Sequence, residues 1–77
     1  MNTPNVNKSE NKRRAARGKL LVDAYSKETG GGCLDELIQD AIADILHFAH
    51  MKNKYFPFSC TRMALRHFGA EVGLEAE

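Results

Sequence analysis

The chain has 77 residues, a formal net charge of +1 and 43% hydrophobic residues, with no Trp. This length allows one small domain, near the size at which a single core is only marginally sufficient. Its apolar runs fall far short of the roughly 20 residues that span a bilayer. The polar start MNTPNVNKSENKRR has no apolar stretch of the kind a secretory signal needs. We therefore expect a cytoplasmic protein without a membrane partner.

Charge is distributed unevenly along the chain. Up to Lys27, seven Lys or Arg accompany two acids, whereas from Glu28 onward four Lys or Arg accompany eight acids. A basic arm on an acidic body is compatible with nucleic-acid binding through the arm. It is equally compatible with a protein surface of unlike charge, including a second copy of the chain.

The first segment, residues 1–8, is polar and rich in Asn, so we expect it to be disordered. Residues 9–28 carry a ragged helical pattern with Ser9 as the expected N-cap. This segment predicts a basic helix or arm. Its basic cluster can be a solvated helix face or a contact with phosphate or an acidic protein; the candidate partner contacts are Arg13, Arg14, Arg17 and Lys19.

Residues 29–33, TGGGC, predict a flexible hinge that ends the basic helix. Three consecutive glycines can also belong to a phosphate-binding loop. That motif continues with Gly-Lys-Ser or Gly-Lys-Thr into a helix, whereas Gly32 is followed here by Cys33. The hinge interpretation is therefore favoured.

The strongest pattern lies in residues 34–51, LDELIQDAIADILHFAHM. Apolar residues recur three and four positions apart throughout this stretch, which predicts an amphipathic helix. Its apolar stripe is wider than one partner helix can cover, so we expect a homodimer. The predicted core and dimer residues are Leu34, Ile38, Ile42, Ile45, Phe48 and, on the last helix, Phe68.

A second helix is predicted to follow, with Ser59 as its N-cap and Gly73 as its terminator. Asn53, which tolerates left-handed backbone, is expected to end the long helix. Residues 34–73 then form a helical hairpin with a loop of about seven residues, too long for a helix-turn-helix. An acidic tail, residues 74–77, completes the chain.

The loop between these helices holds three aromatic residues around Pro57. We expect Phe56 and Phe58 to close the core and Tyr55 to contact a partner, because Tyr and Arg are enriched in binding hot spots. The alternative is that all three aromatics close the open end of the hairpin. The neighbouring candidate contacts are Lys52, Lys54 and Arg62.

The two cysteines precede the long helix and begin the last one. In an antiparallel hairpin Cys33 and Cys60 are about 27 Å apart, far beyond disulfide reach. We expect free thiols in a reducing compartment, with an intermolecular bridge at Cys33 as the alternative.

A metal site is chemically conceivable from Asp44, His47, His67 and Glu71, since imidazole and carboxylate groups suit Zn²⁺, Fe and Mn. The spacing is generic, and each histidine can instead pair with a carboxylate on its own helix. Cys60 and His67 are about 10 Å apart along one helix, too far for a nucleophilic pair. We expect no metal, no cofactor and no enzymatic activity.

Two runs of residues resemble a group of very small proteins encoded by phages and prophages. The pattern of that group is D-x-L-H-x-A followed by A-x-x-H-F-x-A-E, and it matches residues 44–49 and 64–71. The resemblance covers roughly residues 38–72, leaves the basic arm unmatched, and departs at the loop, where an Asp- and Gly-containing turn is typical. It implies a phage accessory gene, and such genes commonly encode binders of host proteins, including inhibitors of defence systems.

The sequence thus predicts an all-α protein: a helical hairpin plus a basic N-terminal helix or arm, assembled as a dimeric helical bundle. The first functional hypothesis is a phage-encoded inhibitor of a host defence system, anti-CRISPR-like, that binds a host protein or ribonucleoprotein complex in the host cytoplasm. The second is a nucleic-acid-binding accessory protein that uses the arm. The third is a metal- or nucleotide-dependent activity at the His and carboxylate face.

Overall fold

A computed structural model describes residues 7–73 of the chain. Within that range the chain forms three helices and no strand: α1 (Lys8–Thr29), α2 (Leu34–Lys52) and α3 (Phe56–Glu71). The predicted all-α fold is confirmed. Most of the expected disordered start and the whole acidic tail lie outside the described residues.

Helix α1 begins at an Asn rather than at the predicted Ser. The Asn7 side chain accepts a hydrogen bond of 3.0 Å from the backbone N–H of Glu10. Asn7 is the better N-cap because the residue three positions after it, Glu10, is acidic, which suits a helix N-terminus. Three positions after Ser9 stands the basic Lys12. The helix ends at Gly30, whose φ of 91° and N–H bond to the Ser26 carbonyl close the last turn.

The turn between α2 and α3 is much shorter than the sequence predicts. It comprises residues 53–55, and Asn53 is extended, with φ −162°, instead of left-handed. The Asn53 side chain accepts a hydrogen bond of 2.9 Å from the Tyr55 N–H. Helix α3 begins at Phe56, three residues before Ser59, because Pro57 suits a first helical turn, where its missing N–H is not needed.

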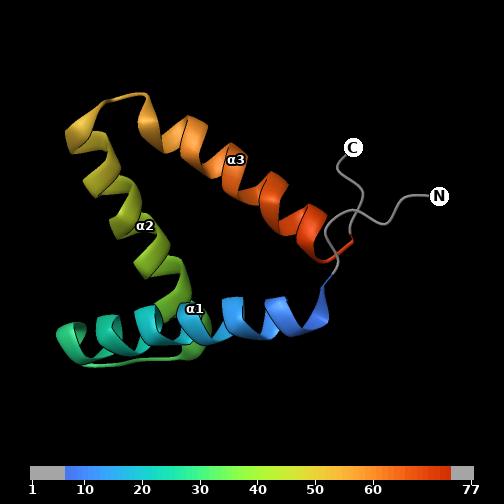
Figure 1. Ribbon diagram of the computed structural model, residues 1–77. Coiled ribbons are helices and arrows are strands. Elements are labelled where there is room, and N and C mark those ends of the chain that lie inside the picture. Colours follow the sequence, from blue (N-terminus) through green and yellow to red (C-terminus); the bar gives the residue numbers. More distant parts are fainter. Residues whose placement is uncertain (1–6, 74–77) are drawn as a thin grey trace.

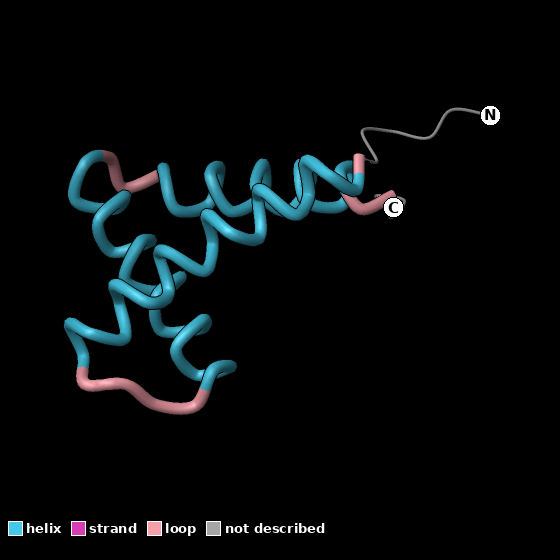
Figure 2. The backbone as a smooth tube through the Cα atoms, turned by 60° about the horizontal axis from the view of Figure 1, so that its bottom comes forward, coloured by secondary structure: helices cyan, strands magenta, loops and turns pink. Residues whose placement is uncertain are grey.

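The three helices form the sides of an open triangle (Figure 1). Helices α2 and α3 diverge from their turn as a V, and the start of α1 meets the end of α3 in both views (Figures 1 and 2). The radius of gyration is 14.3 Å, against about 11 Å for a compact chain of this length. The arrangement of the three helices is therefore less compact than that of a typical domain of this length.

Few apolar side chains are removed from solvent in the described part of the single chain. Leu37, on the first turn of α2, is the one buried hydrophobic residue, at 9% exposure. Fifteen large hydrophobic side chains are exposed, from 40% at Ile38 to 83% at Met51. Scattered exposed apolar residues are normal, but contiguous apolar surface marks interaction sites.

Candidate functional site

The first candidate surface is the apolar face, which we define as the six predicted core and dimer residues. On α2, Ile38, Ile42 and Ile45 follow each other by four and three positions, so they project from one side of the helix. In the single chain these three are 40%, 51% and 55% exposed. The other members are equally accessible: Leu34 66%, Phe48 61% and Phe68 55%.

Helix α1 lies along one edge of the apolar face, where Leu21, Ala24 and Tyr25 line a hollow together with Ile45 and Phe48 of α2. The Tyr25 hydroxyl donates a hydrogen bond of 2.6 Å to the Asp44 carboxylate. This bond, together with desolvation and the negative charges of Asp44 and Asp40, raises the pKa of Tyr25 from 10 to about 12. The pairing holds the middle of α2 against α1, while the six side chains of the apolar face stay 40–66% exposed.

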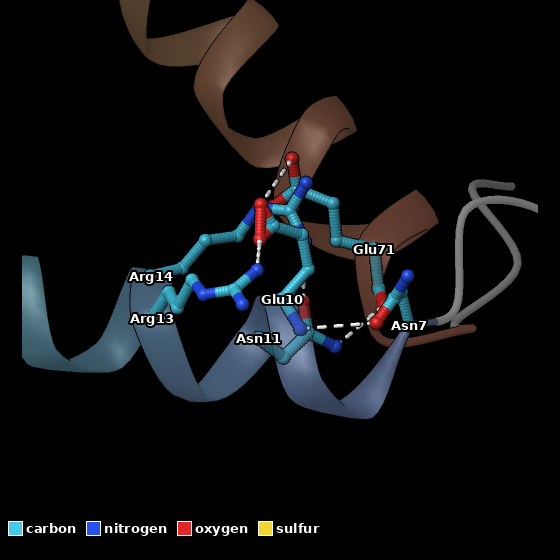
Figure 3. A network of polar contacts seen from close by, with 6 residues as sticks. All are labelled: Asn7, Glu10, Asn11, Arg13, Arg14 and Glu71. Atoms are coloured by element: carbon cyan, nitrogen blue, oxygen red, sulfur yellow. Dashed lines mark hydrogen bonds and ion pairs between the residues drawn. The ribbon is translucent and has the colours of Figure 1, made fainter.

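The start of α1 is tied to the end of α3 by polar contacts (Figure 3). The Asn11 side-chain amide donates to the Glu71 backbone carbonyl at 2.8 Å, and the Arg14 Nε lies 3.5 Å from the Glu71 carboxylate. Arg14 also donates to the Asn11 side-chain oxygen at 2.8 Å. Arg14, a predicted partner contact, is therefore engaged within the chain.

The remaining basic residues of α1 face solvent. Arg13 pairs with Glu10 at 2.9 Å and Lys19 with Asp23 at 2.7 Å, and both basic side chains stay about 70% exposed or more. Lys12 and Arg17 are exposed and have no carboxylate within ion-pair distance among residues 7–73. The charge of α1 is thus available to a partner.

The second candidate surface is a groove between α2 and α3, which we call the basic groove. It consists of two adjoining hollows of about 700 and 710 Å³ that share Leu46, Pro57 and Phe58. Its lining residues are Ala43, Leu46, His47, His50, Lys54, Tyr55, Pro57, Phe58, Thr61, Arg62, Leu65 and Arg66.

Three predicted partner contacts line this groove: Lys54, Tyr55 and Arg62. The Lys54 ammonium lies 5.2 Å from the centre of the Tyr55 ring. Tyr55 is 66% exposed. Phe56 and Phe58 are 45% and 75% exposed, so the prediction that they close the core is wrong for the single chain. Phe58 instead lines the basic groove.

Lys52 lies outside the groove, where its ammonium is 5.4 Å from the centre of the Phe48 ring. The groove also holds residues that the sequence did not single out, among them Leu65 and Arg66. The signal for these residues was their spacing. Phe58, Arg62, Leu65 and Arg66 follow one another by four, three and one positions, which places them on one side of α3.

The four candidate metal ligands do not converge. Asp44 accepts the Tyr25 hydroxyl and Glu71 faces Arg14, while His47 lines the basic groove and His67 is exposed on α3. Among residues 7–73 no three His, Cys, Asp or Glu side chains are grouped to hold a metal ion.

Cys33 and Cys60 are exposed free thiols.

Comparison of the chain with protein-family models, with curated proteins and with solved structures finds no match. Within the described range no helix has the length and apolar character needed to cross a membrane. The functional argument therefore starts from the apolar face and the basic groove.

Proposed function

We propose that this chain is a small binding protein that acts through protein–protein contact. The observation that carries the proposal is the apolar face, whose six side chains are 40–66% exposed on an ordered helical frame. Five of these side chains belong to α2, and Phe68 lies on α3 beside Asn11 and Arg14 of α1. Exposed apolar surface loses water favourably when a protein partner covers it. The framework around it supplies charged and aromatic groups that orient a partner.

A second copy of the chain is the first partner. Two apolar faces brought together by a two-fold axis cover each other, because a two-fold interface uses the same patch on both subunits. Stable interfaces bury about 800 Å² on each partner, and α2, 19 residues long, spans about 28 Å. In this assembly the V of α2 and α3 becomes half of a dimeric helical bundle.

The second partner is a host target. The resemblance of residues 38–72 to small phage and prophage proteins extends the proposal to a phage-encoded, anti-CRISPR-like inhibitor of a host defence complex. Its place of action is then the host cytoplasm. An inhibitor of this class needs a rigid surface and no reaction chemistry, which suits a three-helix frame with exposed hot-spot residues.

An infection assay tests this function. Cells with defined defence systems, each targeting one phage, are transformed with the wild-type chain or with the Ile42→Asp variant. The proposal expects plaque formation to recover in at least one defence background with the wild-type chain and not with the variant. Recovery in none, at equal expression, contradicts the inhibitor function.

Nucleic-acid binding through α1 is the second candidate function. It is favoured by Lys12, Arg13 and Arg17, which are exposed on one ordered helix, and by the three-residue turn between α2 and α3, a length found in helix-turn-helix pairs. The sequence predicts a loop of about seven residues, which is too long for a helix-turn-helix. The observed turn of three residues is not too long. Carboxylates on α2 oppose this function, since four acids lie between Leu34 and Lys52.

Electrophoretic shift of labelled duplex and single-stranded DNA at low and high salt decides this alternative. The matched variant replaces Lys12, Arg13, Arg17 and Lys19 by Gln and keeps Arg14, which joins α1 to α3. If α1 binds phosphate, the shift disappears in the variant and the salt dependence becomes flatter. An equal shift with both proteins excludes α1 as the nucleic-acid site.

A further inference from the structure

The basic groove has an apolar floor. Leu46 from α2 and Pro57 and Thr61 from α3 are half-buried and line its hollows. The Thr61 hydroxyl donates to the Pro57 carbonyl at 2.6 Å, so its polarity is satisfied within α3. Phe58 and Leu65, 75% and 65% exposed, form walls above this floor. The floor and walls therefore favour apolar side chains as ligands.

The rim of the groove is positively charged. Lys54, Arg62 and Arg66 line it, beside the imidazoles of His47 and His50, and neither hollow is lined by an Asp or a Glu. Within residues 7–73 none of the three cations is in ion-pair distance of a carboxylate. Two further hollows differ from the groove, since Asp44 lines one and Glu71 lines the other.

We propose that the basic groove binds an acidic amphipathic segment of a partner protein. Apolar side chains of the segment enter the two hollows, and its flanking Asp or Glu side chains meet Lys54, Arg62 and Arg66. The distance along α3 from Pro57 to Arg66 is about 14 Å, which matches two to three turns of a bound helix. This inference rests on the proposed function and specifies the chemistry of its target.

The charge pattern along α2 favours a short peptide over a nucleic acid. The row of α2 residues that contains His47 continues away from the groove through Asp40 and Glu36, seven and eleven positions earlier. A polyphosphate strand that entered the groove between Tyr55 and Phe58 would run on over these carboxylates. A peptide of two or three turns carries its acidic groups over the cations alone.

The test begins with selection from an unbiased, surface-displayed peptide library on the immobilised full-length chain. We expect the retained sequences to be enriched in Asp and Glu that flank apolar residues at helical spacing. Selection of neutral or basic sequences, or of none, overturns the inference.

Affinities of the selected peptides, measured by fluorescence anisotropy, then locate the site. In the variant Arg62→Glu with Arg66→Glu, the Kd is expected to rise about tenfold or more, because rim cations become like charges. The matched control, Lys12→Glu with Arg17→Glu, makes the same charge change on α1 and is expected to shift the Kd less than about twofold. All four residues are exposed, and circular dichroism checks that both variants fold.

Three results overturn the inference: equal Kd values in the two double variants, loss of binding in the α1 control only, and tighter binding of a single-stranded oligonucleotide that Arg62→Glu with Arg66→Glu abolishes. The outcome is independent of the infection assay. Peptide binding without inhibition of any defence system contradicts the inhibitor function and leaves the inference about the groove intact. Inhibition that survives in the variant Arg62→Glu with Arg66→Glu contradicts target binding by the basic groove and leaves the inhibitor function intact.

Discussion

The backbone carbonyl of Glu71 accepts a hydrogen bond of 2.8 Å from the side-chain amide of Asn11, 60 residues earlier in the chain. This bond satisfies one of the carbonyls left unpaired at the end of α3. Arg14, 3.5 Å from the Glu71 carboxylate, lies beside it. Polar contacts thus close the triangle at the corner where the start of α1 meets the end of α3.

Replacing Asn11 by Ala should open this corner. The change removes the bond to the Glu71 carbonyl and the bond from Arg14. It is expected to lower the free energy of unfolding by about 1 kcal/mol for each hydrogen bond lost. Urea unfolding followed by circular dichroism measures it. The control is Arg13→Ala, which removes an exposed ion pair to Glu10 and should change the free energy by about 0.5 kcal/mol or less. Equal effects would contradict a special role of the Asn11 bond.

Two glycines of α1 should respond to Ala in opposite directions. Gly18 lies inside the helix with nothing within 4 Å of an added Cβ, so Gly18→Ala is expected to stabilise the chain by about 1 kcal/mol. Gly30 has φ 91°, where a Cβ is strained, so Gly30→Ala is expected to destabilise it by about 1 kcal/mol. Thermal unfolding compares the two variants. A loss of stability in Gly18→Ala would show that α1 is not the continuous helix described.

The hydrogen bond between Tyr25 and Asp44 predicts a late tyrosine titration. In a Tyr55→Phe chain, whose remaining tyrosine is Tyr25, the tyrosinate absorbance should appear with a pKa of about 12. Adding Asp44→Asn should return this pKa toward 10, because the variant lacks the negatively charged carboxylate that accepts the hydrogen bond of the Tyr25 hydroxyl. A midpoint near 10 in the Tyr55→Phe chain would contradict the bond.

The same pKa shift sets the sign of a pH dependence. The pKa of Tyr25 is higher in the folded chain than the ordinary value of 10, so its contribution to stability is complete below pH 10. It is lost as the pH rises from 10 to about 12. Urea midpoints of the wild type should therefore fall over this window, and those of Tyr25→Phe should fall less. Parallel curves for the two proteins would rule out the linkage.

Tyr55 tests the contact role of the turn. At 66% exposure it contributes little to the single chain, so Tyr55→Ala should leave the melting temperature unchanged and weaken binding of a partner by about 2 kcal/mol. Isothermal titration with a peptide selected on the basic groove measures the affinity. Phe56→Ala, a less exposed neighbour at 45%, is the comparison. Lower stability with unchanged affinity in Tyr55→Ala would make Tyr55 a structural residue.

The helices were predictable because their signals are local. The spacing of Leu37, Ile38, Ala41 and Ile42 indicates α2 from its own residues, and Gly30 marks the end of α1. The errors were also local. Ser59 was given the N-cap position of Tyr55, because Pro57 was taken as part of a loop instead of a first helical turn. Ser9 was given the N-cap position of Asn7, because Asn7 was counted in the disordered start.

The arrangement of the helices was not predictable in this way. Nothing near Asn11 or Glu71 in the sequence indicates that they meet, so Arg14 was assigned to a partner although it faces Glu71. Lys54, Tyr55 and Arg62 were singled out and do share one groove. Arg66 was missed although it follows Arg62 by four positions and therefore lies on the same side of α3.

Self-association through the apolar face is the central claim, and sedimentation equilibrium tests it most directly. Measured at micromolar concentration with reductant, because Cys33 and Cys60 are exposed thiols, the wild type should show twice the 8.6 kDa mass of one chain. Ile42→Asp, which would bury an unpaired charge between two copies, should sediment as a single chain, and Arg17→Asp on α1 as the wild type does. A fully helical wild type of 8.6 kDa would contradict the account.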